Sequence, residues 1–216
     1  TGYNMPSLSE QFGAIDIYLF DQLLKGTIQP HHQLLDAGCG QGRNAAYFIN
    51  NNYNISGIDS NAASIETLHQ TLLSATSPIK HQFLVGSLEN MPFADHQFDW
   101  VFCNAVLHFA QNQAHFEAML RGLWRVLKPG GRLFIRLASS IGISPSIKAI
   151  KDGRYWLPDG SVRFLVNYPM LGYYSNLLEA HLFEPIKTVN VQQLRCMTTW
   201  CLQKNIEISE SYSFCQ

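Results

Sequence analysis

The sequence predicts an α/β fold in which helices cover both faces of a doubly wound, mostly parallel sheet. Apolar runs of strand length alternate with segments of helix length from about residue 33 to residue 137. This alternation implies parallel strands joined by right-handed crossovers. A glycine-rich turn directly follows the first apolar run. With 216 residues, 46% of them apolar, the chain is long enough for one domain with a sizeable core.

The first expected element is an N-terminal helix. Apolar residues recur there at helical spacing, and the pattern stops near Gly26. They are Leu8, Phe12, Ile15, Leu19 and Leu23. This periodicity predicts a single amphipathic helix. Five strands follow in the prediction, at residues 33–37, 54–59, 81–85, 98–103 and 132–137.

Three helices are expected between those strands. The first runs from the glycine turn to about Asn50. Ser60 and Asn61 have side chains suited to cap the second. The third ends at residues 128–131, where the order Lys-Pro-Gly-Gly is a strong helix stop. The expected buried residues are Ile65, Leu68 and Leu72 in the second helix and Phe116, Leu120, Leu123 and Leu127 in the third.

The pattern loosens after Ala138. Residues 139–166 contain glycines, prolines and aromatic residues without a clean period, which predicts a loop-rich insertion. A helix is expected over 169–180, and two strands near 185–191 and 195–203 close the domain.

Composition restricts the partners and the compartment. Sixteen acidic and fifteen basic residues leave a net charge of −1, which lacks the basic excess typical of nucleic-acid binding. No apolar run approaches the ~20 residues of a membrane span, and no signal segment is recognisable. The five cysteines are odd in number and form no C-x-x-C pair. We therefore expect a cytoplasmic protein with reduced thiols and no metal, nucleic-acid or membrane partner.

The glycine turn indicates the class of ligand. Residues 34–44 read LLDAGCGQGRN, with glycines at Gly38, Gly40 and Gly42. A dinucleotide-binding site has the spacing G-x-G-x-x-G. In this sequence Arg43 occupies the position of the third glycine of that pattern. Asp36 precedes the turn, where a carboxylate suits an amine better than a phosphate. The turn therefore favours a nucleoside that carries an amino acid over NAD.

At this point the chain resembles the class I S-adenosylmethionine-dependent methyltransferases. The resemblance covers roughly residues 33–137, with several motifs in the right order. Its broader pattern is similar to bacterial enzymes grouped with those of ubiquinone biosynthesis. Gly42-Arg43-Asn44 also resembles the tellurite-resistance type of small methyltransferase. The resemblance implies a Rossmann-like sheet of seven strands with the last strand antiparallel, and S-adenosylmethionine as cofactor.

The same resemblance implies one methyltransferase domain over residues 1–216. We expect a helical lid at 1–30, a cofactor-binding core at 31–138, a substrate-side insertion and helix at 139–182, and closing strands at 183–216.

Cofactor contacts are expected at the carboxyl ends of the strands. Asp59, followed by Ser60, ends the second strand and is expected to bind the ribose hydroxyls, although an acid there is also a frequent helix cap. The resemblance places adenine at Ser87 and the backbone N–H of Leu88. Most relatives have Asp where Ser87 stands. The methionine part is expected at Asn104 and Ala105, with its carboxylate on Arg43 and its amine near Asp36, close to the backbone of the glycine turn.

The acceptor site is less well defined by the sequence. His108 is a candidate base or orienting group, with a structural role as the alternative. Arg136 interrupts an apolar strand, and we expect it to face an acidic acceptor rather than a protein carboxylate. Tyr18, Tyr155 and Arg163 complete the candidate pocket.

A small-molecule acceptor is the leading interpretation. The segment Asn104-Ala105-Val106-Leu107 lacks the Pro-Pro-aromatic pattern of adenine methylation, and no Pro-Cys pair for cytosine methylation exists. A metalloid oxyanion as acceptor, or a cofactor-binding protein without turnover, are the alternatives.

Overall fold

A computed structural model of the protein describes residues 7–73, 82–143 and 147–206. Its main sheet has the strand order β10-β11-β5-β4-β1-β2-β3, and the short β9 pairs with β11. The strands are β1 Gln33–Ala37, β2 Asn54–Asp59, β3 Phe83–Val85, β4 Phe98–Asn104, β5 Leu127–Ser139, β9 His181–Leu182, β10 Lys187–Val191 and β11 Arg195–Gln203. β1 to β5 are parallel to one another, and β11 is antiparallel to β5. The predicted doubly wound sheet with an antiparallel last strand is confirmed.

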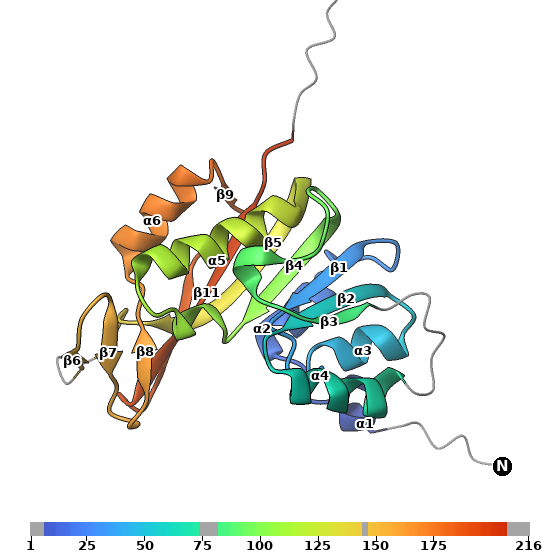
Figure 1. The fold of residues 1–216 in the computed structure, drawn as a ribbon, viewed down its shortest axis with the longest axis horizontal. Coiled ribbons are helices and arrows are strands. Elements are labelled where there is room, and N and C mark those ends of the chain that lie inside the picture. The colour runs from blue at the N-terminus through green and yellow to red at the C-terminus, as the bar shows by residue number, and fades with distance from the viewer. Residues whose placement is uncertain (1–6, 74–81, 144–146, 207–216) are drawn as a thin grey trace, which may run out of the picture.

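Helices cover both faces of this sheet (Figure 1). The helices α2 Ile17–Leu24, α3 Ala45–Asn50 and α4 Ala62–Leu68 pack on one face, whereas α5 Gln113–Val126 and α6 Tyr168–Leu177 pack on the other. Alternation along β5 separates the two cores: Phe134 faces the α2 side, and its neighbours Leu133 and Ile135 face α5. Arg136 has the same parity as Phe134, so it belongs to the face that α2 covers.

The predicted single N-terminal helix is wrong. The structure has two helices, α1 Leu8–Phe12 and α2 Ile17–Leu24. Gly13, at a φ of 60°, ends the first. Asp16 caps the second, because its carboxylate accepts hydrogen bonds from the N–H groups of Tyr18 and Leu19. The apolar periodicity carries across this break, which is why it suggested one continuous helix.

The insertion is more regular than predicted. Its strands β6 Lys148–Ala149, β7 Arg154–Trp156 and β8 Val162–Phe164 form a small antiparallel sheet, which lies at the opposite side of the molecule from α3 and α4 in Figure 1. These strands are only two or three residues long, too short for alternation to be visible in the sequence. Phe164 ties the small sheet to the main core by stacking on Phe116, with 5.0 Å between ring centroids.

The closing elements agree with the prediction. α6, β10 and β11 lie close to their expected positions. The third strand begins at Phe83, and the expected start at His81 lies outside the described residues. Cys39, Cys103, Cys196 and Cys201 are buried free thiols. In the described part of the chain, no helix has the length and apolar character needed to cross a membrane.

Candidate functional site

The glycine turn bends around the end of β1. Gly38, Gly40 and Gly42 have φ angles of 81°, 53° and 84°, a region that glycine enters without steric penalty. A Cβ on Gly40 would meet no heavy atom within 4 Å, whereas one on Gly38 would lie 2.2 Å from a methyl group of Val106. The turn therefore presents bare backbone to open space at Gly40 and packs tightly at Gly38.

Asp59 ends β2 and holds this turn in place. Its Oδ2 accepts a hydrogen bond from the N–H of Gly40 at 2.8 Å, and its Oδ1 accepts one from the N–H of Asn61 at 2.8 Å. The second bond supports the start of α4, so the helix-cap alternative describes part of its role. A carboxylate has about four lone-pair sites, and Asp59 therefore retains acceptor capacity for the hydroxyl groups of a ligand.

A cavity of about 330 Å³, called here the first cavity, opens beside Asp59. The predicted residues Gly38, Ser60, Ser87 and Leu88 line it, and the other lining residues are Gly86, Glu89, Val106, Phe109, His115 and Met119. His115 pairs with Glu89 across the cavity wall. Sequence reasoning missed His115 and Met119, because both come from α5 and nothing in their local sequence shows that α5 covers this end of the sheet.

Several buried polar atoms at the carboxyl ends of β1, β4 and β5 lack hydrogen-bond partners. Asn104 lies beside Arg136 in the register of β4 and β5, and Asp36 lies beside Phe102 on β4. Among the described residues, buried atoms without a hydrogen-bond partner include Asp36 Oδ2, both amide atoms of Asn104 and Arg136 Nε. Buried polar groups are normally hydrogen-bonded, so this cluster indicates a polar ligand at the edge of the sheet.

The carboxyl of Asp36 in this cluster has a strongly shifted pKa. Burial raises its pKa to about 7; the charge of Arg43 opposes this rise, and that of Asp59 adds to it. A buried carboxyl without a cationic partner holds its proton in this way. A ligand ammonium group would supply the missing charge.

The two residues after Gly42 have different roles. α3 begins at Ala45, so Arg43 lies in the turn before the helix, and its side chain is exposed. Asn44 is buried, and its Oδ1 accepts a hydrogen bond from the N–H of Asp16 at 2.9 Å. Asn44 thus anchors the start of α2 to the glycine turn.

A second cavity, of about 350 Å³, adjoins the first. The predicted residues Ala105, His108, Arg136 and Arg163 line it together with Phe109, Ala138, Leu157, Asp159, Ser161, Val191, Arg195 and Met197. Phe109 lines both cavities, and Ala105 lines the second cavity while the next residue, Val106, lines the first. Ala105 has a φ of 62°, an uncommon conformation for alanine that is often found at functional sites.

His108 is a neutral hydrogen-bonding group rather than a base. Burial, and to a lesser extent the charge of Arg163, lowers the pKa of His108 to about 4. Its Nδ1 accepts a hydrogen bond from the N–H of Ala138 at 3.0 Å. In the neutral ring the proton must then reside on Nε2, which makes that nitrogen a donor. This geometry argues against the role of a base and fits both of the other roles, orienting a ligand and a structural one.

Arg136 has a protein partner, contrary to the expectation from the sequence. Its Nη1 lies 2.9 Å from Oδ2 of the buried Asp16, and its guanidinium lies 5.0 Å from the ring centroid of Tyr18. The break between α1 and α2 brings Asp16 here, which no local pattern in β5 reveals. Arg136 still lines the second cavity, so it both pairs with α2 and faces the site.

The two predicted tyrosines stand beside the second cavity rather than on its wall. Tyr18 packs under Arg136 as described. Tyr155 packs against the small core of Ala138, Leu157 and Leu165. Arg163 does line the cavity, with its guanidinium 4.8 Å from the ring centroid of Phe109.

Comparison with known proteins agrees with this geometry. Residues 35–135 match the family model described as "Methyltransferase domain". Over these residues the chain is similar to the class I S-adenosylmethionine-dependent methyltransferases. It is 30% identical over 126 residues to the uncharacterized methyltransferase YodH of Bacillus subtilis, covering 58% of this chain and 48% of that protein. It is also 30% identical over 115 residues to the malonyl-[acyl-carrier protein] O-methyltransferase of Serratia marcescens, covering 53% and 42%.

A solved structure shows the same fold. The 1,6-didemethyltoxoflavin-N1-methyltransferase of Burkholderia thailandensis, solved with bound 1,6-didemethyltoxoflavin and S-adenosylhomocysteine, superposes with a TM-score of 0.66 at 17% identity. The match covers 92% of this chain and 81% of that one. The chain spans about half the length of the curated relatives it matches.

The residues at the carboxyl ends of the strands fit S-adenosylmethionine, the cofactor of these methyltransferases. The unpaired Asp36 Oδ2 and the Asn104 amide suit the polar methionine end. The free acceptor sites of Asp59 suit ribose hydroxyls, and the first cavity lies in the size range of small-molecule sites.

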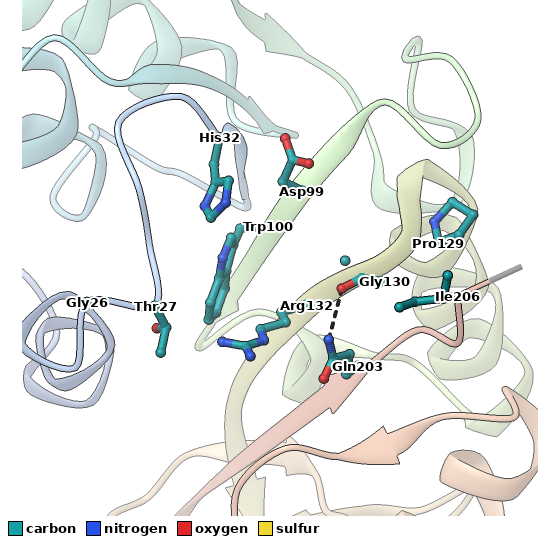
Figure 2. A pocket seen from close by; sticks show the side chains of 11 residues that line it. Gly26, Thr27, His32, Asp99, Trp100, Pro129, Gly130, Arg132, Gln203 and Ile206 are labelled. Atoms are coloured by element: carbon teal, nitrogen blue, oxygen red, sulfur yellow. Dashed lines mark hydrogen bonds between the residues drawn. The ribbon is translucent and has the colours of Figure 1, made fainter.

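The protein also has a cavity of about 630 Å³ at the opposite edge of the sheet. Figure 2 shows Asp99, Trp100 and Arg132 there, at the start of β4 and in the first half of β5. Asp99 pairs with Lys128, and Arg132 lies over the rings of Trp100 and Phe183. Since ligands of parallel sheets bind at the carboxyl ends, the two smaller cavities are the better candidate site.

Proposed function

We propose that this protein transfers a methyl group from S-adenosylmethionine to a small-molecule acceptor. The observation that carries the proposal is the pair of adjoining cavities at the carboxyl edge of the sheet, which share Phe109. One cavity has the residues for the cofactor, and the other is free for an acceptor. The cofactor and the acceptor therefore have separate but contiguous places.

The positions of five predicted cofactor residues support the roles proposed for them. Asp59 binds the ribose hydroxyls, while Ser87 and the N–H of Leu88 bind adenine from the wall of the first cavity. Asp36 pairs with the ammonium group, and Arg43, whose charge reaches Asp36, pairs with the carboxylate of the methionine part.

Catalysis rests on positioning. When bound, S-adenosylmethionine supplies a methyl group already activated on a sulfonium. The chain aligns the acceptor with that methyl group and excludes water. His108 donates a hydrogen bond from Nε2 to the acceptor and removes no proton, since its Nδ1 is engaged by Ala138. The acceptor must therefore be nucleophilic without a base from His108.

The metalloid alternative has less support. Part of the motif that suggests it, Asn44, is engaged in holding Asp16. The second cavity also has apolar residues on its wall, among them Leu157 and Met197, which suit an organic body. Survival on tellurite or selenite of cells that express this protein would distinguish a metalloid acceptor from an organic one.

Calorimetric titration with S-adenosylhomocysteine and with NAD tests the proposal. We expect binding of the first and none of the second. An assay of S-adenosylhomocysteine release across a panel of acceptors then separates an enzyme from a protein that binds the cofactor without turnover. Binding of NAD alone would refute the proposed function.

A further inference from the structure

The second cavity has an excess of positive charge. Three arginines line it, Arg136, Arg163 and Arg195, against one carboxylate, Asp159. His108 is neutral at physiological pH because its pKa lies near 4. An uncompensated charge in a cavity that also has an apolar wall favours an anionic ligand.

The three arginines differ in how they are paired. Arg136 is bound to Asp16 at 2.9 Å, and Arg195 faces Asp159 at 3.6 Å. Among the residues that the structure describes, no carboxylate forms an ion pair with Arg163, whose Nη1 donates only to the backbone carbonyl of Val162. The excess charge of the cavity therefore resides on Arg163.

Arg163 is held in place by the architecture of β8. The next residue, Phe164, is fully buried and stacks on Phe116 of α5. Because neighbouring residues of a strand point to opposite faces, burial of Phe164 in the main core directs Arg163 to the other side of β8. There its guanidinium covers the ring of Phe109, which is 52% exposed. Phe109 is the residue that the two cavities share.

Part of the remaining wall of the cavity is apolar. Leu157, Ala138 and Met197 line it beside the arginines. A polyvalent inorganic oxyanion has no apolar part that could pack on such a surface. An organic acid can pack its apolar body on the wall and pair its charge with Arg163.

We propose that the acceptor is a small organic acid whose carboxylate pairs with Arg163 while its apolar body packs on Phe109 and Leu157. This inference rests on the proposed function, because it assigns the substrate class of the same site. The carboxylate serves as the anchor, and a planar, bidentate guanidinium is the side chain best suited to hold it.

The test is binding of matched acids and amides to the protein saturated with S-adenosylhomocysteine. Three pairs have nearly the same shape but differ in charge: benzoate and benzamide, phenylacetate and phenylacetamide, hexanoate and hexanamide. We expect the acid of at least one pair to bind about ten-fold more tightly than its amide, the scale of a charge-assisted hydrogen bond. Arg163→Met should abolish this preference, and Arg163→Lys should retain part of it.

Arg121→Met is the matched control, since it removes one arginine from an exposed ion pair with Glu117 on α5. It should leave the preference unchanged. Equal binding of acid and amide in every pair, no binding by any acid, or tighter binding of selenite than of all three acids would overturn the inference. Failure of S-adenosylhomocysteine to bind the unmodified protein would instead refute the proposed function, and its binding to Arg163→Met shows that the variant is folded.

Discussion

Asp36 should couple both cofactor binding and stability to pH. Its carboxyl is buried at the end of β1, and burial raises its pKa from 3.8 to about 7. In the free protein the carboxyl is therefore protonated below pH 7. The ammonium group of S-adenosylhomocysteine would favour the ionised form, so binding below pH 7 must release a proton.

The size of the effect follows from that pKa. Between pH 5 and pH 7 the affinity for S-adenosylhomocysteine should rise by about ten-fold per pH unit and then level off. Titration calorimetry at pH 5, 6, 7 and 7.5 measures this slope. Repeating it in buffers of different ionisation enthalpy counts the released proton. Asp36→Asn, which cannot ionise, should bind weakly and without this slope.

The free energy of unfolding should fall as the pH rises, whereas the affinity for S-adenosylhomocysteine should increase. A folded-state pKa above the unfolded value means that ionisation penalises the folded protein, with the penalty growing from pH 4 to pH 7. From the shift of Asp36 this penalty reaches at most about 4 kcal/mol. Asp36→Asn should therefore unfold at higher denaturant concentration than the unmodified protein at pH 8, with a smaller difference at pH 5. A difference independent of pH would show that Asp36 does not titrate here and would refute the reasoning.

Three further outcomes are expected. Asp59→Ala should weaken S-adenosylhomocysteine binding by about 1.5–3 kcal/mol and also lower the melting temperature, since two backbone N–H groups lose their acceptor; calorimetry that shows unchanged affinity would contradict the ribose contact. Arg136→Met should cost about 3 kcal/mol in denaturant unfolding, the lower end for a broken buried pair, because Asp16 is left unpaired; near-native unfolding would show that the pair contributes little. Once an acceptor is known, the pH profile of kcat should show no step near 6.5, because burial lowers the pKa of His108 to about 4; a step there that disappears in His108→Gln would restore His108 as a base.

Local patterns in the sequence determined the sheet and the cofactor side of the site. Strand-length apolar runs, the glycines at 38, 40 and 42, and the acid at the end of β2 are all readable within a few residues of one another. Parallel strands bring their carboxyl ends to one edge, so Asp36, Asp59 and Asn104 were predictable as neighbours. The same topology brings Asp59 to the N–H of Gly40 and gathers the unpaired atoms of Asp36 and Asn104 at one edge.

Tertiary structure alone decided the acceptor side. Asp16 reaches Arg136 across 120 positions of sequence, and it does so because Gly13 breaks a helix that periodicity shows as continuous. The strands that position Arg163 are two or three residues long, and their pairing depends on Phe164 entering a core formed by α5. Long-range contacts of this kind produce no periodic pattern in the sequence, because tertiary packing, and not the neighbouring residues in the chain, determines which residues meet. The sequence shows the charge of Arg163. Only the folded protein shows that no carboxylate among the described residues forms an ion pair with it.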